Sequence, residues 1–322
     1  MSSLLKSLGN FINSSVDSFS TTNSADTPKA DTNNEHGEVE IDQIPPSNLL
    51  LEEKDCSSCT DPCDDHKSFP TYLELDRESP LLGSMSPYGR HFMIATAMCD
   101  WPARIEEDYG SLAANLHELV KENPMEWRTF ITNTSMISTH ATTYHCSMDI
   151  VVLPDNIIIG NVGPEDAQLV YDIFVRAPLP KKETNSVDYF KTLDLKELGV
   201  YPNPYDSMIL ICSHRKRDKR CGVTAPILSR EFDHVLRELD IHDGDGGTTV
   251  LMVSHVGGHK FAGNVICYVN KGLTGIWYGR VDPCDCRPIV EETIIKKKVI
   301  KELYRGSMNH SFGSDKCNRI KW

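Results

Sequence analysis

The chain has 322 residues, a formal net charge of −13, 39% hydrophobic residues and 8% aromatic residues, a composition typical of a globular protein with one or two domains and tails. It contains no apolar run long enough to cross a bilayer, and its acidic balance argues against a general nucleic-acid binder. Its eleven cysteines are unevenly spaced and follow no secretory signal, which argues against a disulfide scaffold and predicts a cytoplasmic protein, with the nucleus as a further location.

Residues 1–87 predict a mostly disordered acidic tail. They are rich in Ser, Thr, Asn and acidic residues, and they contain too few apolar side chains to offset the entropy lost on ordering. Cys56, Cys59 and Cys63, with His66 nearby, could bind a metal on their own. Their role stays open, and we leave them out of the predicted site.

Residues 88–186 predict an α/β unit, because apolar periods of two and of 3.6 alternate along them. The predicted strands are 91–98, 128–137, 149–153 and 157–159, and the predicted helices are 112–120 and 165–176. The cysteines here, Cys99 and Cys146, lie far apart with no His-x3-His between them. The pattern therefore predicts a scaffold or partner surface.

Residues 187–305 predict a second α/β unit, joined to the first by the polar linker 178–185. A helix at 187–198 is expected to pack across the junction, and residues 306–322 form a polar tail ending in Trp322. The predicted strands are 207–212, 249–254, 264–269 and 274–280, and the predicted helices are 227–239 and 289–304.

Four candidate metal ligands lie within this second unit. Cys212 ends a predicted strand, and Cys221 lies beside a predicted helix N-terminus, where partial positive charge favours a thiolate. His255 and His259 flank Gly257 and Gly258, which permit a tight bend with positive φ. Such a bend can turn both imidazoles toward one ion or cluster.

The spacing of these ligands favours an iron–sulfur cluster over structural zinc. Eight residues separate the cysteines and thirty-three separate Cys221 from His255, whereas zinc fingers use much shorter intervals. A [2Fe-2S] core can take two thiolates on one iron and two imidazoles on the other.

The strings CSHRKRDKRCGVTAP, HVGGHKFAGN and IWYGRV resemble the sucrase/ferredoxin-like family. The resemblance implies two thioredoxin-like domains, the C-terminal one a thioredoxin-like [2Fe-2S] ferredoxin. It also implies that Cys212 and Cys221 bind one iron and that His255 and His259 bind the other. The terminal Trp322 is similar to a tail signal read by the cytosolic iron–sulfur assembly machinery, although Lys321 departs from that signal.

The charge of such a site predicts its chemistry. Two thiolates and two neutral imidazoles around an oxidised core of charge +2 leave the site neutral, so it accepts an electron more readily than an all-cysteine site. The second nitrogen of each imidazole can also titrate, which predicts proton-coupled electron transfer. The basic segment 214–220 is either a solvated loop or a collar that steers an acidic reductase toward the cluster.

The remaining cysteines leave alternatives open. We expect Cys267 to fill the core, whereas Cys284 and Cys286 are the best competing ligands. We predict a cytosolic electron-transfer protein that serves redox homeostasis and oxidative-stress tolerance, with a separate redox partner protein as donor. The rival functions are a reductase of small redox-active compounds and a zinc-stabilised, actin-associated scaffold.

Overall fold

The computed structural model describes residues 45, 47–51, 66–142, 146–180 and 186–308. Cys56, Cys59, Cys63 and Trp322 lie outside the described residues. Within the described part of the chain, no helix has the length and hydropathy needed to span a membrane.

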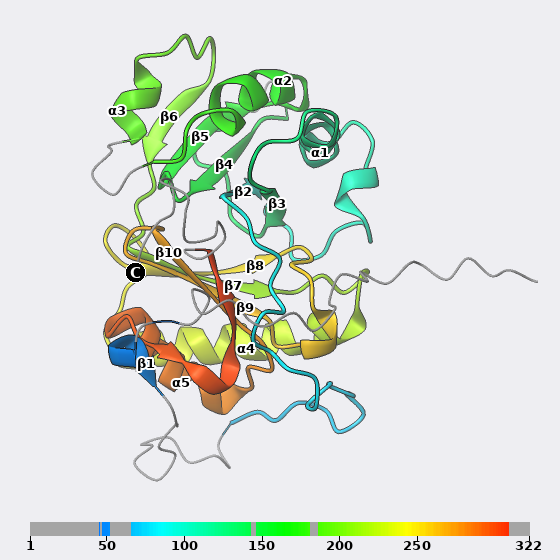
Figure 1. Cartoon of the computed structure of the whole chain (residues 1–322), viewed down its shortest axis with the longest axis vertical. Coiled ribbons are helices and arrows are strands. Elements are labelled where there is room, and N and C mark those ends of the chain that lie inside the picture. Colours follow the sequence, from blue (N-terminus) through cyan, green and yellow to red (C-terminus); the bar gives the residue numbers. More distant parts are fainter. Residues whose placement is uncertain (1–44, 46, 52–65, 143–145, 181–185, 309–322) are drawn as a thin grey trace, which may run out of the picture. The chain divides into compact units, whose positions relative to one another are not determined.

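The predicted α/β class is confirmed. Strands from both halves of the chain join in one mixed, ten-stranded sheet with the order β12-β10-β9-β7-β8-β3-β2-β4-β5-β6. Figure 1 shows α1 and α2 beside the N-terminal strands, and α4 and α5 beside the C-terminal ones. The thioredoxin-like assignment of each half stays a prediction.

The N-terminal half begins with a β-α-β unit followed by an antiparallel hairpin. Its elements are β2 (Arg90–Ala95), α1 (Leu112–Glu122), β3 (Thr129–Thr134), β4 (Met148–Leu153), β5 (Ile157–Val162), α2 (Ala167–Val170), a π-helical turn (Tyr171–Val175), α3 (Ser186–Lys191) and β6 (Gly199–Pro202). β2 pairs parallel with β3 and antiparallel with β4. The helix predicted over 187–198 is too long, because α3 ends at Lys191 and Lys196 has a positive φ.

The C-terminal half repeats this order as far as its π-helical turn, and then has a short strand, β11 (Val299–Ile300), where the first half has α3. Its elements are β7 (Ser207–Cys212), α4 (Lys219–Glu238), β8 (Thr248–Val253), β9 (Val265–Val269), β10 (Thr274–Tyr278), α5 (Cys286–Pro288), a π-helical turn (Ile289–Ile295), β11 and β12 (Tyr304–Ser307). β7 pairs parallel with β8 and antiparallel with β9.

The helix predicted over 289–304 is wrong beyond Ile295. Lys297 has a φ of +59°, which a helix cannot contain, and the β-branched pair Val299 and Ile300 then forms β11. β11 pairs parallel with β1 (Leu50–Leu51), and β12 pairs with β10 at the edge of the large sheet. Residues 304–307 therefore extend the sheet.

Three hydrophobic clusters form the core, and the third joins the two halves. α1 and α2 cover one face of the N-terminal strands, and α4 and α5 cover one face of the C-terminal strands. The third cluster lies on the opposite face of the N-terminal strands and of the C-terminal strands. Alternate residues of one strand therefore belong to different clusters. In β7, Ile211 faces the α4 cluster and Cys212 the shared one.

Candidate metal centre

The two candidate thiols meet at the start of α4. Cys212 ends β7, as predicted. The helix predicted over 227–239 begins earlier, because α4 starts at Lys219, so Cys221 lies within its first turn and not merely beside it. Asp218 caps this helix, and its carboxylate accepts a hydrogen bond from the Arg220 amide at 2.9 Å. Both thiols are buried and hydrogen-bonded to each other, which lowers the pKa of Cys212 well below its ordinary value and raises that of Cys221.

The two candidate imidazoles lie on either side of the diglycine bend, as predicted. Gly257 and Gly258 have φ angles of +85° and +67°, in the left-handed region that favours glycine. The bend brings the ring centroids of His255 and His259 to 5.6 Å. A hydrogen bond from the His255 ring also helps to lower the pKa of Cys212, after the larger effect of Cys221.

The donor chemistry of this group fits a site with two ligand pairs. Nδ1 of His255 is buried and has no hydrogen-bond partner among the described residues, which leaves it available as a metal ligand. Within the described ranges, no three His, Cys, Asp or Glu side chains converge closely enough to hold a single ion. A [2Fe-2S] core takes two protein donors at each iron, and thiolates and imidazoles are donor types that such a core can use.

His259 is the solvent-facing member of the group. Its side chain is 48% exposed, and its Nε2 lies 3.9 Å from a carboxylate oxygen of Asp218. Partial burial lowers the pKa of His259, while Asp218 opposes that shift. The neighbouring basic segment, which includes Arg215, Lys216 and Arg217, is exposed, so positive charge lies near this side of the site.

His214, which follows β7, connects the site to the N-terminal half. Its buried Nε2 lies 3.0 Å from the carbonyl oxygen of Trp101 and 2.9 Å from that of Pro102. Its Nδ1 accepts a hydrogen bond from the His255 amide at 3.0 Å. These partners fix the proton on Nε2, and they connect the loop after β2 to a candidate ligand.

Arg305 is the residue that the sequence reasoning missed. It lies in β12 with 1% of its surface exposed, and its guanidinium donates to the carbonyl oxygen of Gly257 and to Oδ1 of Asn264 at 3.3 and 2.7 Å. It also donates to the side chain and carbonyl of Ser84. Arg305 stands between Tyr304 and Gly306, and this short stretch shows no hydrophobic pattern that would distinguish a buried arginine from an exposed one.

The other cysteines of this half have different surroundings. Cys267 is buried in the α4 cluster, as predicted, and burial raises the pKa of its thiol. Cys286 belongs to the same cluster, and burial raises its pKa well above the ordinary value. Cys212 and Cys221 lie in the shared cluster. Cys284 is partly exposed.

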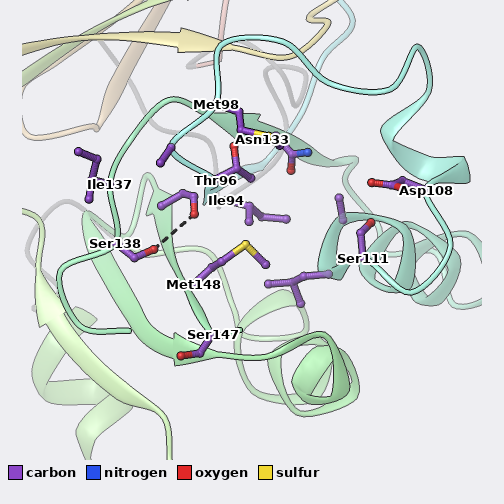
Figure 2. Close-up of a pocket in the computed structure, with 14 residues that line it drawn as sticks. Ile94, Thr96, Met98, Asp108, Ser111, Asn133, Ile137, Ser138, Ser147 and Met148 are labelled. Carbon is purple, nitrogen blue, oxygen red and sulfur yellow. Dashed lines mark hydrogen bonds between the residues drawn. The ribbon is translucent and has the colours of Figure 1, made fainter. Parts of the chain in front are cut away.

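A cavity of about 450 Å³ lies in the N-terminal half, at the ends of β2 and β3 and the start of α1. Figure 2 shows Thr96, Asn133 and Met148 among the side chains around it. The backbone amide of Asn133 donates to Oγ of Ser254 at 3.0 Å, and the backbone carbonyl of Asn133 accepts from the backbone amide of Ser254 at 2.9 Å. Because Ser254 directly precedes His255, the cavity wall is tied to the candidate centre.

Comparison with known proteins gives the chain a family. The sucrase/ferredoxin-like family matches residues 81–306. The chain is 31% identical over 283 residues to altered inheritance of mitochondria protein 32 of Clavispora lusitaniae, a match that covers 83% of this chain and 95% of the relative. It is 29% identical over 282 residues to actin patches distal protein 1 of Saccharomyces cerevisiae, covering 81% and 88%.

No solved structure matches the chain. The family match covers both halves of the ten-stranded sheet and all four candidate ligands, since it runs from residue 81 to residue 306. The chain therefore belongs to the sucrase/ferredoxin-like family.

Proposed function

We propose that this protein binds a [2Fe-2S] cluster and carries single electrons together with protons. Cys212 and Cys221 would hold one iron, and His255 and His259 would hold the other. The observation that carries the proposal is the pairing of donors, with two buried thiols in contact and two imidazoles on one glycine bend beside them. When bound, the cluster would supply a one-electron couple of higher potential than an all-cysteine ferredoxin.

The chain's own residues support proton coupling at His259. This ring reaches solvent, whereas the Nδ1 atom of His255 is buried. Asp218 lies 3.9 Å from Nε2 of His259, where its charge would stabilise a proton held on that nitrogen. His214 keeps the His255 backbone in place and excludes water from the buried side.

We further propose a separate redox protein as the electron donor. Arg217 is one of the positive charges that act on His259, and Arg215, Lys216 and Lys219 are exposed in the same segment of the chain. Such a collar would attract an acidic partner, and electron delivery would slow as salt screens it. A donor whose rate does not change with ionic strength would contradict this role of the loop.

The cellular setting of this function is proposed to be the cytoplasm, in redox homeostasis and oxidative-stress tolerance. The cysteines are odd in number and unevenly spaced, which argues against a disulfide scaffold and supports a reducing compartment. Trp322 would present the chain to the iron–sulfur assembly machinery. Removing Trp322 should then lower the iron content of the purified protein without changing its fold.

Metal analysis of protein purified from iron-replete cells tests the main proposal. We expect two irons and two acid-labile sulfides per chain, with visible absorption. Replacing His259 by Cys should keep the cluster, lower its potential and flatten the pH dependence of that potential. A colourless protein with one zinc per chain would overturn the proposal and favour a structural role, for which the name of the yeast relative suggests actin patches.

The second candidate is a reductase of small redox-active compounds. The cavity at the ends of β2 and β3 favours it, because Asn133 links this cavity to the residue before His255. Replacing Met148 by Trp should fill the cavity. This function requires that Met148→Trp slow oxidation of the reduced protein by a small quinone while leaving transfer between proteins unchanged.

A further inference from the structure

Arg305 is a buried cation with an unusual set of partners. Its guanidinium donates four hydrogen bonds, to Gly257, Asn264 and Ser84, and all these acceptors are neutral. Among the described residues, no carboxylate forms an ion pair with it. A charge buried without a counter-ion is costly unless another negative group lies near.

The negative groups near Arg305 are the candidate ligands. Burial lowers the pKa of Arg305 to about 10, and the negative charges of thiolates at Cys212 and Cys221 oppose this shift. The side chain is therefore charged at neutral pH. Its guanidinium also lies over the rings of Phe261 and Trp277, at 5.5 and 5.6 Å from their centroids, which holds it in one orientation.

Arg305 also supports the bend that carries the histidines. It donates to the Gly257 carbonyl and to Oδ1 of Asn264, and Nδ2 of Asn264 donates to the Gly258 carbonyl at 2.9 Å. The Asn264 carbonyl accepts from the Cys212 amide at 3.0 Å. One side chain thus connects the thiol strand with the imidazole loop.

We propose that Arg305 is a positioning residue whose fixed positive charge favours the reduced form of the centre. The inference rests on the proposed function. The oxidised centre with its four ligands is neutral, and the reduced one carries a charge of −1 until a proton is taken up, so a buried cation stabilises the reduced form selectively. Low dielectric around Arg305 strengthens this effect.

The test compares three variants of the whole protein by redox titration. Arg305→Gln keeps hydrogen-bond donors and removes the charge, and we expect at least a tenfold smaller equilibrium constant for reduction, or 59 mV for a one-electron couple. Arg305→Lys keeps the charge and should stay within a twofold change. Arg280→Gln is the matched control, because Arg280 also contacts the Phe261 ring, at 5.1 Å, but has Asp76 nearby at 3.7 Å.

An unchanged potential in Arg305→Gln, or an equal fall in Arg280→Gln, would overturn the inference. If Arg305→Gln does not fold, Arg305→Lys decides, and a tenfold fall in its equilibrium constant would overturn the charge role. Hydrogen exchange in the metal-free protein separates the two proposals, since it needs no cluster. Positioning would be contradicted if Arg305→Gln or Arg305→Lys showed the same exchange across 255–264 as Arg280→Gln. Wild-type protein without iron would overturn the proposed function and the charge role that rests on it, while a change in exchange would still support positioning.

Discussion

Each half of the molecule contains a fully buried arginine, and the two differ in what surrounds them. Arg90 in β2 pairs with Asp155 at 2.5 Å and donates to the carbonyl oxygens of Phe174 and Ala177. Arg305 in β12 donates only to neutral acceptors among the described residues, and the charges that raise its pKa are those of the Cys212 and Cys221 thiolates. The first charge is balanced within the fold, whereas the second is balanced only when the thiols carry negative charge. Two similar arrangements of strands and helices therefore differ in how they balance a buried charge.

The largest expected difference between the two halves is the loss of bound iron when a candidate ligand in the C-terminal half is replaced. Cys212→Ser should remove most of the bound iron, because serine is a poor substitute for a thiolate. Cys286→Ser is the control, since Cys286 lies in the other core cluster. Iron analysis and the visible spectrum report the result, and equal iron loss in both variants would favour Cys286 as the ligand.

The matching change in the N-terminal half should act on folding. Arg90→Met leaves Asp155 buried without its partner, and we expect the free energy of unfolding to fall by about 3–5 kcal/mol. Urea denaturation measures this. Arg176→Met is the control, because its pair with Asp172 is exposed, and it should cost less than about 1 kcal/mol. Equal losses in the two variants would mean that burial does not set the strength of the pair.

The diglycine bend gives a smaller and sharper test. Gly257 and Gly258 both have positive φ, so alanine at either position costs about 1–2 kcal/mol in the folded state. A Cβ at Gly257 meets nothing within 4 Å, whereas one at Gly258 would lie 2.3 Å from Nη2 of Arg305.

Because hydrogen bonds hold Arg305 in place, Gly258→Ala should cost about 1–3 kcal/mol more than Gly257→Ala. It should also lower iron content. Thermal unfolding and metal analysis check both expectations, and equal stability of the two variants would indicate that Arg305 moves aside freely.

The smallest predicted effect is a pH dependence of the free energy of unfolding, caused by a buried histidine at the junction between the halves. His91 is buried, with Nδ1 2.8 Å from the Tyr268 hydroxyl and Nε2 2.8 Å from Oγ1 of Thr132. Burial lowers the pKa of His91 well below its usual value of 6.5. Below pH 6.5 the unfolded chain therefore binds a proton that the folded chain does not, so stability falls as the pH is lowered.

His91 should contribute at most about 1.4 kcal/mol per pH unit to the slope of the unfolding free energy against pH. His91→Gln should flatten the curve of unfolding free energy against pH between 6.5 and 5. His117, whose pKa burial also lowers, would keep part of the slope. A variant with the full wild-type slope would assign the effect to other groups.

Much of the local structure could be predicted from the sequence. β7, α4 and β9 follow their apolar periods, and the glycine pair correctly indicated a bend between the two histidines. The C-terminal helix was wrong because apolar residues over 289–304 fit both a helix and short strands, and the positive φ of Lys297 decides between them.

The joining of the two halves and the role of Arg305 could not be predicted. β3 and β8 pair through Thr134 and Val253 at their ends, and such a contact leaves no pattern in sequence. The partners of Arg305, Ser84 and Gly257, lie 221 and 48 residues away. Only folding brings these groups together.

The alternation along β7 has a consequence for any attempt to divide the protein. Because Leu210 and Cys212 face the cluster shared with the N-terminal strands, an excised C-terminal half would leave an apolar wall and a candidate ligand open to solvent. We expect such a fragment to aggregate or to oxidise, because in the whole chain the first half shields Leu210 and Cys212 from water.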